Sequence, residues 1–193
     1  MLSHLLLAFL LQTQASNASL GYQFTVPEGF SAFPEGAAGN PDIVECWAED
    51  EPVSQQGGLV LCVQRLRGVI GREPIRPDEM PVGAQLTTMK WHDFELYGVR
   101  AQVERDEGPS FTLVAQVPLK PEAVQLLLAG PADQVERGDT LLKTTLASLH
   151  GESNWLTHAE RMERIGQTVG IWITIAFAVG TFFYMRKRRA KAA

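Results

Sequence analysis

Apolar and polar residues alternate in short runs along the middle of the chain, and turn-forming residues separate the runs. The first run, 22–26, places Tyr22, Phe24 and Val26 on one face before a Pro-Glu-Gly turn. A period of two residues is typical of a half-buried β-strand. Further strands are predicted over residues 30–33, 43–48, 58–67, 85–92, 94–104, 110–117 and 122–129. The middle of the chain is therefore predicted to form a sheet.

Two of these predicted strands, 85–92 and 94–104, are close enough in sequence to form a hairpin that turns near His92 and Asp93. The run 122–129 has apolar residues at helical spacing as well as an alternating pattern. We interpret it as a strand, because its Val and Leu residues keep the period of two.

One helix is predicted at the end of this region. Asp139 is a suitable N-cap, and Gly151 is a suitable terminator. The apolar face between them consists of Leu141, Leu142, Leu146 and Leu149. A helix with one apolar face must bury it, so this helix is expected to lie on the sheet. The predicted fold class is α+β, an antiparallel sheet packed by a C-terminal helix, over residues 20–151.

A long apolar segment near the C-terminus predicts a transmembrane helix. Ile165 to Met185 is a stretch of 21 residues without a charge, and a helix of that length spans about 30 Å, the thickness of the hydrocarbon core. A short basic tail, 186–193, follows it, and its cations are Arg186, Lys187, Arg188, Arg189 and Lys191. The positive-inside rule places this tail in the cytoplasm.

The N-terminal residues 1–18 are typical of a secretory signal peptide, with an apolar core from Leu5 to Leu11. Cleavage is predicted after Ala18, with Ala15 as the other candidate. An uncleaved anchor or a different start site is the alternative interpretation. With the transmembrane prediction, this segment places a single-pass protein in the cell membrane, with its domain in the periplasmic or extracellular space.

The residues around the predicted span carry two further signals. Thr157 and Glu160 have the spacing of a capping box, so the helix is expected to begin within the juxtamembrane linker, 152–164. Small residues at four-residue spacing, Gly166, Gly170, Thr174 and Ala178, form one stripe along the span. Such a stripe lets two helices approach closely, which predicts self-association or a partner helix, although small residues are also common in membrane helices.

Composition and charge exclude several classes of protein. The 193 residues are 45% hydrophobic and 20% charged, which is ordinary for a globular domain and excludes a collagen-like or disordered chain. All 22 acidic residues and 12 of the 17 basic residues precede Met185, so the net charge is −10 before it and +5 after it. An acidic exported domain is a poor match for nucleic acid, which requires a basic face.

Cys46 and Cys62 are the only cysteines. In an exported domain they can form a disulfide, which would stabilise the fold by about 3 kcal/mol in the chain-entropy model. Two unpaired buried thiols are the alternative. A redox catalyst is not expected, because the chain has no CxxC motif.

No motif in the sequence predicts a catalytic, cofactor or metal site. His92, His150 and His158 are scattered and have no companion at metal-ligand spacing. The nucleophile-elbow, phosphate-loop and dinucleotide-binding glycine motifs are absent. We therefore predict a protein that is not an enzyme and has no cofactor.

Four segments resemble the PsbP-like and DcrB-like α/β sandwich family. They are GYQFTVPEGFSAFP, FTLVAQVPL, EAVQLLLAGP and DTLLKTTLASLHG, and the resemblance covers roughly residues 22–150. Members of this family are generally non-enzymatic subunits, envelope lipoproteins or binding proteins, so the resemblance implies a binding or assembly role. This chain departs from the lipoprotein members, because its predicted anchor is a C-terminal membrane helix.

The leading hypothesis is a non-catalytic binding or assembly module for an envelope partner. The first alternative is a domain that binds a small apolar ligand between sheet and helix. The second is an envelope hydrolase, in which His92 or Asp93 would converge with a serine, Cys46 or a carboxylate.

Overall fold

The computed structural model describes residues 13–33, 40–51, 57–80, 82–105, 108–157 and 160. The chain divides into two compact units, Met1–Trp155 and Leu156–Ala193. The predicted span, its small-residue stripe, the basic tail and the apolar core of the signal peptide lie outside the described residues. Within the described residues, no helix is both long enough and apolar enough to cross a membrane.

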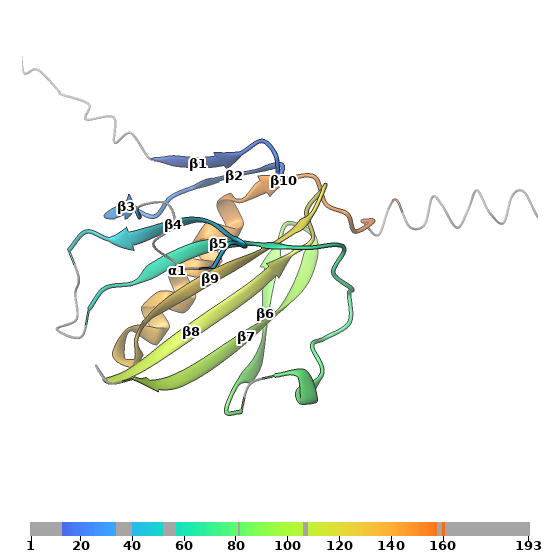
Figure 1. Cartoon of the computed structure of the whole chain (residues 1–193). Coiled ribbons are helices and arrows are strands. Elements are labelled where there is room, and N and C mark those ends of the chain that lie inside the picture. The colour runs from blue at the N-terminus through green and yellow to red at the C-terminus, as the bar shows by residue number, and fades with distance from the viewer. Residues whose placement is uncertain are drawn as a thin grey trace, which may run out of the picture. The chain divides into compact units, whose positions relative to one another are not determined.

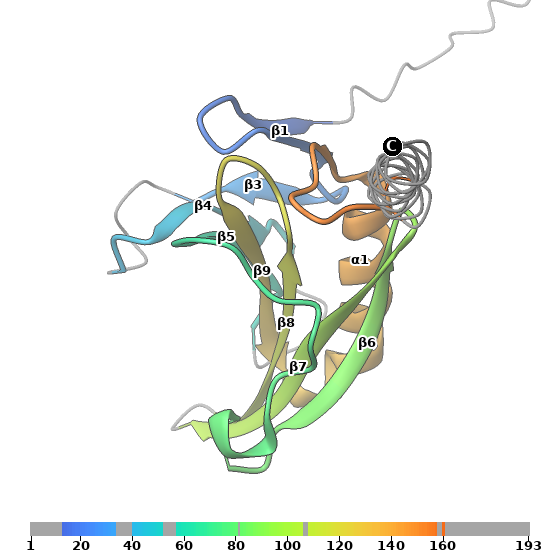
Figure 2. The ribbon, with the colours of Figure 1, turned by 90° about the vertical axis from the view of Figure 1, so that its right-hand side faces the viewer.

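Two antiparallel sheets and one α-helix make up the described part of the first unit (Figure 1). The smaller sheet has the order β1-β2-β10, and the larger has the order β3-β4-β5-β9-β8-β7-β6. The strands are β1 (Gln14–Asn17), β2 (Tyr22–Thr25), β3 (Phe30–Ala32), β4 (Ile43–Glu49), β5 (Val60–Leu66), β6 (Gln85–Trp91), β7 (Phe94–Arg105), β8 (Gly108–Val117), β9 (Ala123–Pro131) and β10 (His150–Gly151). The helix α1 (Val135–Ser148) packs on one face of the larger sheet, as the second view shows (Figure 2).

The predicted α+β class, with a C-terminal helix on an antiparallel sheet, is confirmed. The ambiguous run 122–129 is a strand, β9, and the hairpin of β6 and β7 turns at His92 and Asp93. The smaller sheet was not predicted, because one of its strands, β1, lies within the residues assigned to the signal peptide. Cleavage after Ala18 stays a prediction, and it would remove all of β1, including the buried Ala15.

The predicted helix boundaries are wrong at both ends. The helix begins at Val135, directly after the 3₁₀ turn η2 (Ala132–Gln134), so Asp139 lies inside it and pairs with Lys143 rather than capping it. It ends at Ser148, because the next residues leave it to pair with β2 as β10. Gly151 is therefore a strand residue and not the terminator.

The main core fills the space between α1 and the larger sheet. Leu142 and Leu146 of the helix are fully buried against side chains such as Phe111 and Leu128 of the sheet. Gly138 lies so close to Phe111 that an added Cβ would come within 2.5 Å of its ring. The packing here leaves no room for one further carbon atom.

The folded domain continues past Gly151, to Trp155. Ser153 and Leu119 form an isolated antiparallel β-bridge. The indole N–H of Trp155 donates a hydrogen bond to the Ile70 carbonyl at 2.9 Å. The start of the predicted linker is thus part of the domain. Beyond it, the predicted capping box is confirmed, since the backbone N–H of Thr157 donates to Glu160 at 2.7 Å and the backbone N–H of Glu160 donates to the Thr157 hydroxyl at 3.2 Å.

Candidate functional site

The larger sheet has one face that α1 covers and one that no described element covers. Figure 1 looks onto the uncovered face, with the helix behind it. We call this uncovered surface, over β3 to β9, the open sheet face. Its side chains stand in rows that cross the strands, because residues opposite each other in neighbouring strands point to the same side of a sheet.

The central row of the open sheet face is entirely apolar. It crosses six strands through directly paired residues, which are Leu86, Val99, Val114, Leu127, Cys62 and Cys46. Leu86 is 41% exposed, and the four residues that follow it in the row are half-buried. Hydrophobic side chains that remain accessible side by side on a flat sheet mark a contact surface.

A second row lies beside the first and is also uncharged. Its members are Ala101, Thr112, Ala129, Val60, Ala48 and Ser31. Thr112 lies at the centre of the face. Val114 is on the same strand, β8, and Val99 is on the adjacent strand, β7. The side chains of this row are small, so they project little above the backbone of the twisted sheet (Figure 2).

Three glutamines border the apolar rows on the other side. Gln116, Gln125 and Gln64 are paired across β8, β9 and β5. Gln125 donates to Gln64 at 3.1 Å and accepts a longer hydrogen bond of 3.5 Å from Gln116. The ladder gives the open sheet face a polar border without a formal charge.

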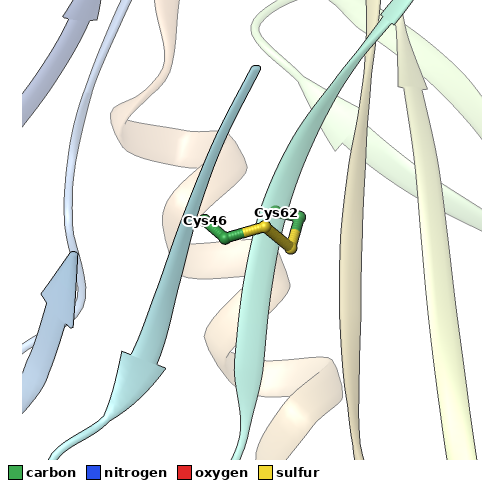
Figure 3. Close-up of a disulfide and its surroundings, with 2 residues drawn as sticks. All are labelled: Cys46 and Cys62. Carbon is green, nitrogen blue, oxygen red and sulfur yellow. A yellow bond between two sulfur atoms is a disulfide. The ribbon is translucent and has the colours of Figure 1, made fainter. Parts of the chain in front are cut away.

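The disulfide lies at one end of the central row. Cys46 of β4 and Cys62 of β5 are directly opposite each other, and the structure joins them, which is the first of the two alternatives left by the sequence (Figure 3). Their Cα atoms are 4.1 Å apart. The bridge fastens β4, near the edge of the sheet, to the interior strand β5 and so holds the open sheet face in one piece.

The opposite side of the domain carries charged groups instead. The Glu49 side chain is only 5% exposed, and its carboxylate forms an ion pair with Arg137 of α1. The same carboxylate accepts a hydrogen bond from the backbone N–H of Leu59 at 3.2 Å. The hydrogen bond from Arg137 holds the pKa of Glu49 below its ordinary value, although partial burial opposes this. Arg137 also donates to Gln134 at 2.7 Å. This network fixes the first turn of α1 to the end of β4.

Tyr22 of the smaller sheet and Glu45 of the larger sheet lie close together, and Tyr22 is buried while Glu45 is half-buried. Burial raises the pKa of Tyr22, and the nearby Glu45 raises it further. Burial likewise raises the pKa of the Glu45 carboxyl. Neither residue lines the two grooves described below.

Two grooves flank α1. One of about 490 Å³ lies between the helix and the segment after β2, and its lining includes Val26, Pro27 and Leu141. Another of about 530 Å³ lies between α1 and β6, at the edge of the larger sheet. Between these two grooves Leu142 and Leu146 of the helix are fully buried, so a small apolar ligand held between sheet and helix would have to bind at a margin of the helix.

The groups that the hydrolase hypothesis needs do not converge. His92 lies in the turn between β6 and β7, where Nε2 is 3.1 Å from the Leu149 carbonyl, and Asp93 is exposed. Cys46 is in the disulfide. The imidazole ring of His92 lies beside that of His150, with the two ring centroids 5.8 Å apart. Among the described residues, no group of three or more His, Cys, Asp or Glu side chains could hold a metal ion.

Sequence reasoning missed the open sheet face, although the sequence contains a signal for it. The run from Ala123 to Ala129 is apolar at six of its seven positions. A strand that is apolar on both faces is typical of one that is covered on both sides. Only one side of β9 is covered by a described element, and the other side is the open sheet face.

No protein-family model matches the sequence, and no curated protein matches it either. Several solved structures are similar. LpqN of Mycobacterium tuberculosis, described as involved in cell envelope biogenesis, has 12% identity and a TM-score of 0.47, over 72% of this chain and 88% of LpqN. Cyanobacterial PsbP of Synechocystis has 13% identity and a TM-score of 0.47, over 72% of this chain and 91% of PsbP.

A protein of Bacteroides thetaiotaomicron has 10% identity and a TM-score of 0.50, over 74% of this chain. This chain spans about half of that protein, 49% of its length. At these identities the similarity concerns the fold alone.

Proposed function

We propose that this chain is a single-pass membrane protein whose exported domain is a non-catalytic binding or assembly module for an envelope partner. The observation that carries this proposal is the open sheet face. Its three rows contain no charged residue in a domain whose sequence is acidic overall. An accessible, uncharged and largely apolar surface of this breadth favours contact with another macromolecule.

The sequence supplies the anchor in this proposal. The segment from Ile165 to Met185 would span the membrane, and the cations at 186–189 and 191 would hold the C-terminus in the cytoplasm. Trp155 is the last residue of the folded domain, so nine residues separate it from the predicted span. A tether of that length keeps the domain near the membrane and its partners within the same envelope layer.

Site-specific photocrosslinking of the full chain in its native membrane tests the proposal. A photoreactive amino acid replaces Val114 on the open sheet face or, as the control, Thr140 on the exposed side of α1. We expect Val114 to give crosslinked protein products that mass spectrometry can identify, and Thr140 to give few. Equal crosslinking at both positions, or none at Val114, would contradict the proposed role of the open sheet face.

A further inference from the structure

The chemistry of the open sheet face suits contact with an identical face. In a two-fold symmetric dimer the same patch is used on both copies, and residues at the axis meet their own counterparts. A charged residue at the axis would therefore face a like charge, and the three rows have no charged residue. The residues before Met185 carry a net charge of −10, so two copies repel each other least where they meet through an uncharged surface.

The area of the open sheet face suits an interface of modest size. Its three rows hold fifteen residues, and each occupies about 4.8 Å across the strands and about 6.6 Å along them, so the face covers roughly 480 Å². Two such faces in contact would bury about 950 Å², slightly below the range of standard specific interfaces. Two sheets pack face to face about 10 Å apart, and the small side chains of the second row allow that approach.

The proposed membrane anchor supports this pairing. Two copies in one membrane have the same orientation, so a two-fold axis along the membrane normal can relate them. Confinement to the membrane raises the effective concentration of each copy for the other, which strengthens an interface of modest area.

We propose that the partner of the open sheet face is a second copy of this chain, bound face to face about the centre formed by Thr112 and Val114. This inference rests on the proposed function and makes it specific. The glutamine ladder on the border would set the register, because side-chain amides both donate and accept hydrogen bonds.

Energy transfer between full-length chains in phosphatidylcholine liposomes tests this inference. Chains labelled with a donor or an acceptor at the C-terminus are mixed, and the dimer fraction is measured as lipid dilutes the protein. Val114→Lys and Thr112→Lys would each bury two ammonium groups at the interface. We expect each to raise the protein density at half-dimerisation at least tenfold. Thr140→Lys, on the exposed side of α1, adds the same charge and should leave it unchanged.

Gly170→Leu is measured in parallel, since the predicted stripe in the span offers another way to dimerise. A dimer that both face variants leave intact and Gly170→Leu disrupts would overturn the inference, and so would a wild-type chain that stays monomeric at every density. Thr112→Lys keeps the test valid if Val114→Lys does not fold. Crosslinks from Val114 to a different protein in native membranes would show that the partner is not a second copy of this chain. The proposed function would still hold in that case.

Discussion

Leu127 and Leu128 are neighbours on β9, and their side chains lie on opposite sides of the larger sheet. Leu128 points to the α1 side and is fully buried, whereas Leu127 points to the open sheet face and is half-buried. The α1 side also has the ion pair of Glu49 and Arg137, and the three rows of the open sheet face have no charged residue. One side holds the domain together, and the other is the surface that we propose to bind a partner.

The comparison shows how one strand can contribute to stability on one side and, as we propose, to binding on the other. Side chains on the α1 side are enclosed by the helix, and their removal leaves a cavity in the domain. Side chains on the open sheet face contact mainly their neighbours in the rows. Their removal should therefore affect association more than folding.

The largest expected difference is between matched truncations of these two leucines. Leu128→Ala should lower the free energy of unfolding by about 2–5 kcal/mol, because it opens a cavity in the core. Leu127→Ala should lower it by less than about 1 kcal/mol, as a half-buried side chain loses less buried area. Urea denaturation of the full chain in detergent, followed by far-UV circular dichroism, measures both. Equal losses of unfolding free energy in the two variants would contradict the difference between the α1 side and the open sheet face.

Removal of the disulfide should have the next largest effect. The double variant Cys46→Ala with Cys62→Ala should lose about 3 kcal/mol, because the unfolded chain gains the freedom of the released loop. The single variants serve as controls, since each already lacks the bridge and should lose a similar amount. A double variant as stable as the wild type would show that the bridge does not stabilise the sheet.

Gly138→Ala tests how closely α1 packs on the sheet. Alanine favours a helix by about 1 kcal/mol over glycine, yet its Cβ would meet the Phe111 ring at 2.5 Å. We expect a net loss of about 1–3 kcal/mol in the free energy of unfolding, as for other overpacked cores. The control is Thr140→Ala at an exposed helix position, which should be neutral or stabilising. A stabilised Gly138→Ala variant would mean that the helix can move away from the sheet.

The smallest of these effects is expected at the ion pair, and it depends on pH. Glu49→Gln should lose about 1 kcal/mol near pH 7, less than is typical of a hydrogen bond to a charged group, because the Arg137 side chain is 41% exposed and solvent screens the pair. The pKa of Glu49 is lowered in the folded state, so its contribution is complete above the ordinary value of 4.5 and disappears as the pH falls below that value. The difference between wild type and variant should shrink accordingly in denaturation measured from pH 7 to pH 3. A difference that is constant over this range would contradict the role of the carboxylate charge.

The strands were predictable because their residues alternate and because breakers separate them. Tyr22, Phe24 and Val26 are all buried, as their spacing indicated. The boundaries of α1 were not predictable in the same way. Gly138 looks like a break in a helix, but tertiary packing against Phe111 requires it there. Asp139 was consequently mistaken for a cap.

The candidate site was less predictable than the fold. The sequence places Cys46 and Cys62 in two strands, but only the strand register puts them opposite each other. The same holds for Val114 and Leu127, which become neighbours only through the pairing of β8 and β9. Local patterns show which face of a strand is apolar, and they do not show which strands adjoin.

Carbene footprinting of the full chain tests most directly whether the open sheet face is the binding surface. The reagent labels accessible side chains, and mass spectrometry compares chains in their native membrane with chains diluted into detergent. We predict that Val114 and Leu127 are protected in the membrane and become labelled on dilution, while Leu141 in the groove beside α1 is labelled equally in both. Equal labelling of Val114 and Leu127 in the two states, or protection confined to Leu141, would contradict the account.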